Sequence, residues 1–133
     1  MSVTTSDGVA VRADPDAFVE AVSRDAKRMR PGLVELCTTV DAWSPEAQEH
    51  DLGRRCLEAI LDQPGWTVRV LTKNVAVTRD FDLIERHRDR VQVGFSITAT
   101  ARGEMATRAL EPNVSSNAER TLAMVEAHRR GLR

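Results

Sequence analysis

Polar side chains that can hold an anion follow three apolar segments of this sequence. A lysine provides a positive charge, and hydroxyl and amide groups provide directional hydrogen bonds, which together suit a carboxylate or a phosphate. The residues are Thr38, Thr39 and Asp41 after segment 33–37, Thr72, Lys73 and Asn74 after segment 67–71, and Ser96 and Thr98 near the end of segment 91–97. In α/β sheets ligands bind beyond the carboxyl ends of the strands, so we expect these side chains to share one rim. Ordinary loop capping with a solvated lysine is the alternative interpretation.

Four segments have the composition of β-strands: 9–12, 33–37, 67–71 and 91–97. Segment 33–37 is short and mostly apolar and follows Pro31-Gly32, which predicts a strand buried on both faces. Segment 91–97 is rich in β-branched residues, which favour strands.

Helices are predicted between and after these strands. Asp14-Pro15 is a helix start signal, and the apolar stripe that follows predicts a helix to about Met29. Ser44-Pro45 begins a second helix, in which Gly53 costs roughly 1 kcal/mol relative to alanine, so its first half is expected to be a separate turn or loop. Thr78 is expected to cap a third helix. Ser116 and Glu119 form a capping-box pattern for a last helix that ends at Gly131.

Four strand-helix units predict an α/β fold with a parallel sheet and right-handed crossovers. A complete eight-stranded α/β barrel takes about 250 residues, so a chain of 133 residues is expected to be close to half of such a barrel, with a small open sheet as the alternative. The predicted organisation is a disordered N-terminus over 1–8 and one partial barrel over 9–133. Its exposed parallel edges favour self-association or pairing with a partner chain.

The composition restricts the classes of function. Nineteen Lys and Arg against twenty Asp and Glu leave a net charge of -1, which gives no support for nucleic-acid binding. No segment approaches the roughly 18 apolar residues that span a bilayer, and the first ten residues do not resemble a signal peptide, so we expect no membrane contact and a cytoplasmic location. The two cysteines, Cys37 and Cys56, are expected to be reduced, buried thiols, and no metal site is predicted.

Several motifs occur in an order that resembles the radical S-adenosylmethionine (SAM) enzymes, in particular the branch similar to spore photoproduct lyase. They are CTTVDAWSPE at 37–46, RRCLE at 54–58, LTKN at 71–74, VGFSIT at 93–98, LEP at 110–112, and Arg120. The resemblance covers nearly the whole chain but only the middle part of the family's barrel.

The resemblance implies a partial TIM barrel, SAM as cofactor, and a SAM-derived radical that abstracts hydrogen from a substrate. Lys73 and Ser96 fall where the family contacts the methionine carboxylate of SAM, which agrees with the anion-binding rim. Glu111 and Arg120 align with an acidic and a basic position near the cofactor's ribose or in the surrounding packing. For Glu111 the alternative is a loop acid before proline, and for Arg120 it is a charge on a helix surface. Trp43 is expected either to stack on an adenine or to pack in the interior.

The chain departs from the family at the iron-sulfur cluster. The family holds a four-iron four-sulfur cluster with three closely spaced cysteines before the region matched by 9–12, and this sequence has no such triplet. We therefore expect the sequence to be a truncated or internal segment that is inactive by itself. The alternatives are a non-catalytic module that pairs through its open sheet edges, and a small SAM- or nucleotide-binding domain without radical chemistry.

Overall fold

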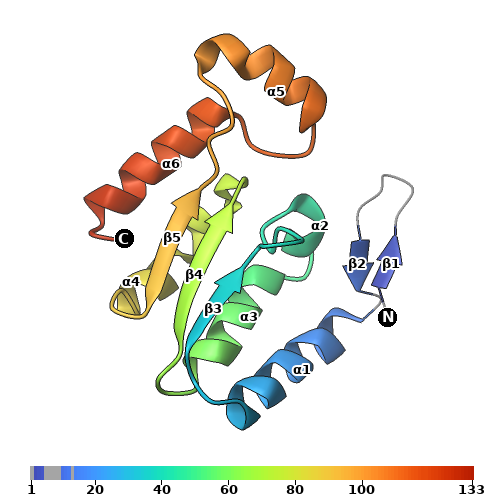
Figure 1. Ribbon diagram of the computed structural model, residues 1–133, viewed down its shortest axis with the longest axis vertical. Helices are drawn as coiled ribbons and strands as arrows, with labels where there is room; N and C mark the ends of the chain where they lie inside the picture. The colour runs from blue at the N-terminus through green and yellow to red at the C-terminus, as the bar shows by residue number, and fades with distance from the viewer. Residues whose placement is uncertain (1, 5–9, 13) are drawn as a thin grey trace.

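The computed structural model describes residues 2–4, 10–12 and 14–133, and its centre is a three-stranded parallel sheet (Figure 1). The strands are β3 (Leu33–Leu36), β4 (Thr67–Thr72) and β5 (Val91–Phe95), and they lie side by side in chain order. Leu33 is opposite Thr67, and Val68 is opposite Val91. The expected α/β class with a parallel sheet is confirmed. This arrangement brings the carboxyl ends of β4 and β5 to one edge, where the candidate residues follow.

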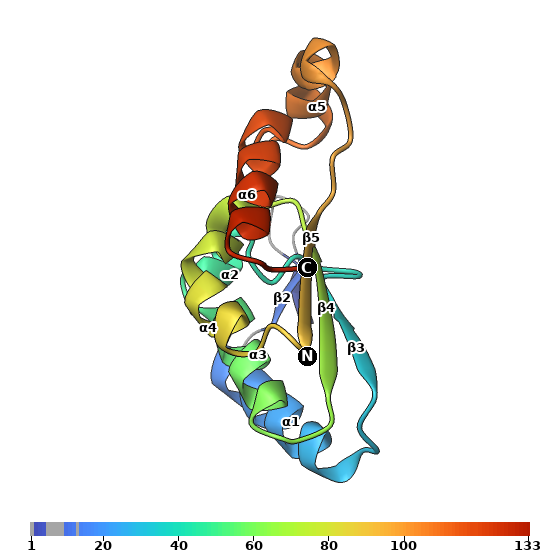
Figure 2. The same ribbon diagram turned by 90° about the vertical axis from the view of Figure 1, so that its left-hand side faces the viewer.

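Helices cover one face of this sheet (Figure 2). They are α1 (Pro15–Arg28), α3 (Leu52–Leu61), α4 (Phe81–Arg86) and α6 (Asn117–Arg129). Side chains of β4 consequently alternate: Val68 and Val70 are buried, whereas Arg69 and Leu71 are exposed on the opposite face. The predicted burial of segment 33–37 on both faces is wrong, because β3 alternates between exposed and half-buried side chains. Among the described residues, no helix covers one of its faces.

The local start signals form the predicted caps. The Asp14 carboxylate accepts the Ala17 N–H at 3.0 Å, and Ser116 and Glu119 form the complete capping box of α6. The helix predicted from Ser44-Pro45 is divided into α2 (Pro45–Gln48) and α3, with Asp51 between them in a left-handed conformation at φ 48°. The first half is therefore separate, as expected, but it is a short α-helix and not the expected turn or loop.

Two helical segments differ from the prediction. After β4 the chain forms a 3-10 helix, η1 (Val75–Asp80), and only then α4. Thr78 does not cap α4, because its hydroxyl donates to the Val75 carbonyl at 2.8 Å. After β5 the chain forms η2 (Ala101–Gly103) and α5 (Glu104–Leu110), which the sequence did not predict.

The N-terminal strand differs from the prediction in its pairing. β2 (Ala10–Arg12) pairs antiparallel with β1 (Ser2–Thr4), and Val3 is opposite Val11. The expected strand 9–12 is therefore not a fourth member of the parallel sheet, and its first residue lies outside the described residues. Residues 1 and 5–8 of the expected N-terminal tail also lie outside them.

The two outer edges of the parallel sheet differ. No strand among the described residues pairs with the outer edge of β3. Beside β5, the Val93 N–H donates to the Arg133 carbonyl at 2.7 Å, so the last residue lies along this strand. Within the described part of the chain, no helix has the length and apolar content needed to cross a membrane.

Candidate functional site

Charged side chains converge at the carboxyl ends of β4 and β5. The Lys73 ammonium forms a short ion pair with Oε1 of Glu111, and Nη2 of Arg120 donates to Oε2 of the same carboxylate at 3.2 Å. Nη1 of Arg120 donates to the backbone carbonyl of Ser96 at 2.7 Å. Four of the predicted site residues, Lys73, Ser96, Glu111 and Arg120, are therefore neighbours. We call Lys73, Ser96, Glu111 and Arg120 the rim cluster.

Arg120 is the fixed member of the rim cluster. Its side chain is 0% exposed, so its predicted alternative position on a helix surface is wrong. Its guanidinium donates to Glu111, to the Ser96 carbonyl and, through Nε, to the Ser115 carbonyl at 2.7 Å. A buried guanidinium requires such partners, because an unpaired buried charge is costly. Arg120 thus joins the end of β5 to the loop before α6.

Lys73 is the accessible cation of the rim cluster. Its side chain is 38% exposed, whereas that of Glu111 is 20% exposed. The Lys73 ammonium, and then Arg120, hold the pKa of the Glu111 carboxyl below its ordinary value. Glu111 is therefore ionised at neutral pH, and one carboxylate is balanced by two cations.

Asp41 positions the backbone of Lys73. Its carboxylate accepts the Lys73 N–H at 2.9 Å, the Thr72 hydroxyl at 2.7 Å and an Asn74 amide N–H at 2.9 Å. It also accepts the Trp43 N–H at 2.9 Å. Both of its oxygens are engaged, so Asp41 connects the loop after β3 to the end of β4. Contact of this carboxylate with a cofactor, as the sequence proposed, would require it to leave these donors.

Trp43 and Thr39 do not extend the rim cluster. Trp43 is 0% exposed, and its Nε1 donates to Oδ2 of Asp80 at 2.7 Å, so the packing interpretation is confirmed. The other oxygen of Asp80 accepts from Arg54 at 3.1 Å. Thr39 is exposed, and none of the described hydrogen bonds connects it to the rim cluster. The sequence did not identify this contact of the buried Trp43 and Asp80 with the half-buried Arg54, because no local pattern links residues 26 to 37 positions apart.

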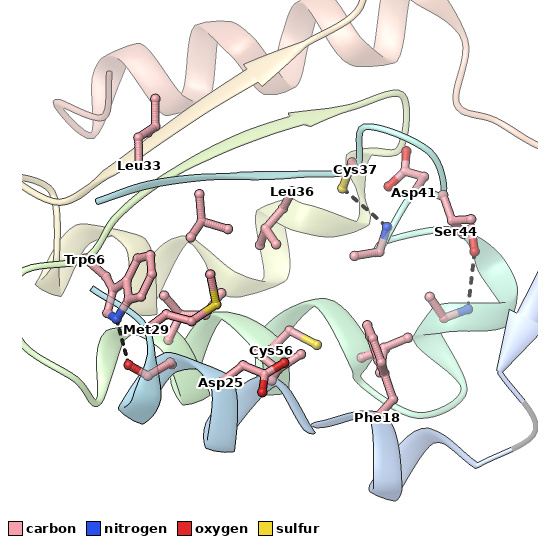
Figure 3. A pocket seen from close by; sticks show the side chains of 18 of the residues that line it. Phe18, Asp25, Met29, Leu33, Leu36, Cys37, Asp41, Ser44, Cys56 and Trp66 are labelled. Carbon is pink, nitrogen blue, oxygen red and sulfur yellow. Dashed lines mark hydrogen bonds between the residues drawn. The ribbon is translucent and has the colours of Figure 1, made fainter. Parts of the chain in front are cut away.

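A separate pocket of about 660 Å³ lies between α1, α3 and β3 (Figure 3). Its lining is mainly apolar and includes Phe18, Met29 and Trp66. Both cysteines also line it. Burial raises the pKa of Cys37 to about 12 and that of Cys56 to about 11, so both are protonated thiols at neutral pH.

The residues fit an iron-sulfur cluster poorly. Such a cluster is held by several deprotonated thiolates, and this sequence has two thiols whose pKa values favour protonation. Among the described residues, no group of three or more His, Cys, Asp or Glu side chains is placed to hold a metal ion.

Comparisons of the chain with protein-family models, curated proteins and solved structures found no match.

Proposed function

We propose that this chain is a SAM-binding segment of a radical SAM-type protein similar to the spore photoproduct lyase branch. The observation that carries the proposal is the rim cluster: the chain already holds one carboxylate with Lys73 and Arg120 at the carboxyl ends of parallel strands. The resemblance of the sequence motifs also implies that Lys73 and Ser96 contact the methionine carboxylate of SAM. A sheet covered by helices on one face only is also what part of a TIM barrel requires.

In the proposed complex Lys73 binds the cofactor's carboxylate. Its side chain is partly exposed, and Asp41 accepts its backbone N–H, so the lysine extends from a defined position. Ser96 is half-buried next to it, and its carbonyl is occupied by Arg120, which leaves the hydroxyl as the group offered to a ligand. In the resembled family the bound cofactor supplies a radical that abstracts hydrogen from a substrate.

The proposed role of this chain is binding and orientation of SAM, without its cleavage. The family's cluster needs three thiolates, whereas Cys37 and Cys56 are two protonated thiols in an apolar pocket. Reductive cleavage of SAM would thus require cluster ligands other than those of this sequence.

Calorimetric titration of SAM into the purified chain tests the proposal. A hydrogen bond to a charged group contributes roughly 1.5–3 kcal/mol, so Lys73→Ala is expected to weaken binding about 10- to 100-fold. The sequence contains one other lysine, the exposed Lys27 of α1, and Lys27→Ala is the matched control that should leave the affinity unchanged. Absence of SAM binding by the parent protein, or equal losses in the two variants, would contradict the proposal.

A non-catalytic module that pairs through its sheet edges is the second candidate function. Two observations favour it: the outer edge of β3 pairs with no described strand, and the apolar pocket lies beside that edge. Exposed edges of this kind are templates for pairing with another chain. Light scattering across a dilution series distinguishes the two functions. A protein that is monomeric at every concentration and binds SAM supports the first, whereas a stable dimer that ignores SAM supports the second.

A further inference from the structure

The apolar pocket between α1, α3 and β3 presents exposed apolar surface in a concave site. Met29 of α1, Leu33 of β3 and Val40 of the following loop line the pocket, and each of these side chains is exposed. The pocket volume of about 660 Å³ lies within the range of about 300–1,000 Å³ that is typical of small-molecule sites. An apolar ligand is favoured here, because its binding removes apolar surface of both partners from water.

Asp25 places a charge within the apolar wall that α1 contributes. Phe18, Val22, Asp25 and Met29 follow one another at spacings of four, three and four residues, so they share one side of the helix, and all of them line the pocket (Figure 3). The Asp25 carboxylate approaches Nε of the neighbouring Arg24 at 3.9 Å, and both side chains are more than half exposed. Such an ion pair contributes little, so a ligand can take the carboxylate from Arg24.

The other charged residues that line the pocket are also acidic. Glu46 in the first turn of α2 is half-buried, and its side chain has no hydrogen bond or ion pair with any described residue. Asp41 lines the pocket too, but its oxygens are engaged by donors at the end of β4. Within the described part of the chain, no Lys, Arg or His side chain lines this pocket. The pocket therefore combines apolar surface with negative charge, which favours a cation over an anion.

We propose that this pocket binds an amphipathic cation, an apolar molecule that carries a protonated amine or a quaternary ammonium group, with Asp25 as its ion-pair partner. The apolar body of the ligand packs between α1 and β3, and its cationic group lies at the Asp25 carboxylate. Glu46 adds a second negative charge to the same pocket. None of the rim-cluster residues lines this pocket, so the proposal does not depend on SAM binding.

NMR titration of the ¹⁵N-labelled chain, followed at the two indole N–H groups, tests the proposal. Trp66 lines the pocket, and its Nε1 donates to the Ala26 carbonyl at 3.0 Å, whereas Trp43 lies outside the pocket and is the internal reference. The probes are decylammonium, decanoate and hexylammonium. Decylammonium should bind at least about 10-fold more tightly than decanoate, because the acids attract one probe and repel the other. Hexylammonium should bind at least about 15-fold more weakly than decylammonium, which corresponds to half-burial of the four missing methylenes.

Asp25→Asn should reduce the preference for the cation. This variant keeps the shape of the side chain and removes its charge, so decylammonium should bind about 2- to 5-fold more weakly, the size of an exposed ion pair, and decanoate should bind no more weakly. Glu20→Gln is the matched control, because it removes a charge at an exposed position of α1 outside the pocket, and it should bind all three probes as the parent does.

Each contrary outcome overturns a stated part of the proposal. If decanoate binds as tightly as decylammonium, charge does not select the ligand. If hexylammonium binds as tightly as decylammonium, or if Asp25→Asn and Glu20→Gln weaken binding equally, the cation is attracted to the acidic surface in general and the pocket is not its site. If no probe shifts the Trp66 indole signal, the pocket takes no such ligand, and a dimer detected by light scattering would then identify a second copy of the chain as its occupant.

Discussion

Replacing Gly53 with alanine is expected to destabilise the protein, although alanine is the better helix former. Gly53 is the second residue of α3 and lies against the loop after β3, which carries Ala42 and Trp43. A Cβ atom at this position would lie 2.5 Å from Cε2 of Trp43 and 2.8 Å from the carbonyl oxygen of Ala42. Neither neighbour can move easily, because the Trp43 ring is fully buried and the Ala42 oxygen belongs to the backbone.

The size of the effect follows from three contributions. Alanine gains roughly 1 kcal/mol over glycine in a helix. Overpacking a filled interior costs roughly 1–3 kcal/mol. If the Trp43 ring shifts, its bond to Asp80 is weakened, and an unsatisfied buried partner costs about 1–3 kcal/mol more. The net expectation for Gly53→Ala is a loss of about 2 kcal/mol in the free energy of unfolding.

Urea denaturation followed by far-ultraviolet circular dichroism measures this loss. Gly32→Ala is the matched control, because a Cβ at Gly32 would meet nothing within 4 Å, and its stability should stay within about 1 kcal/mol of the parent. The reasoning is refuted if Gly53→Ala unfolds at a higher urea concentration than the parent with an unchanged slope, since helix propensity would then outweigh the contact with Trp43.

Four further expectations follow from the contacts. Arg120→Ala should lower the free energy of unfolding by roughly 3 kcal/mol, measured in urea, because it removes a buried guanidinium and leaves three half-buried acceptors without their donor. Arg90→Ala should lower it by about 2 kcal/mol, measured by thermal melts, because its guanidinium donates to three carbonyls at the C-terminal end of α3 and the loop after it. The pKa of Glu111 is lowered, so its contribution to stability is complete above the ordinary pKa of 4.5 and is lost as the pH falls through the folded-state pKa. The free energy of unfolding of Glu111→Gln should therefore decline less on acidification than that of the parent protein. Iodoacetamide should alkylate Cys37 and Cys56 more slowly at pH 8 than it alkylates the urea-unfolded chain, since Cys56 is buried, Cys37 is half-buried and both have raised pKa values. Equal rates would contradict this protection.

The helix starts were predictable because they depend on hydrogen bonds within a few residues. Asp14 with Ala17, and Ser116 with Glu119, form caps that require only their own local sequence. Thr78 shows the limit of this reasoning. It stands before an apolar helix, yet its hydroxyl bonds to Val75 because the preceding residues form a 3-10 helix.

The burial of β3 was not predictable, because it depends on where the helices lie. An apolar run such as 33–37 is compatible with a strand covered on both faces. Here the helices cover one face, so Leu33 is 55% exposed while Val34 is half-buried. The pairing of β2 was likewise not predictable from segment 9–12, because it depends on the partner strand β1 at Ser2–Thr4.

Part of the candidate site was predictable from the rule that ligands bind at the carboxyl ends of parallel strands. The rule placed Lys73 and Ser96 on one rim. The Arg120 guanidinium connects them, because it donates to the Ser96 carbonyl and to the carboxylate of Glu111, which pairs with Lys73. The burial of Arg120 was not predictable, because α6 shows a weak apolar stripe and Arg120 lies within a polar stretch of this helix. Its partner Glu111 comes from the loop after α5, a helix that the sequence did not predict.

The two acidic residues that contact Lys73 have opposite consequences for ligand binding. Asp41 binds its backbone N–H and is itself held by Thr72 and Asn74, so this contact fixes where the lysine begins. Glu111 binds its ammonium, and the lysine side chain is partly exposed, so a carboxylate bound as proposed would compete with this contact. Loss of the Asp41 carboxylate should therefore weaken every ligand of the rim cluster alike, because it displaces the cation. Loss of the Glu111 charge should instead favour a carboxylate at Lys73, because the cation stays in place and only its competitor is removed.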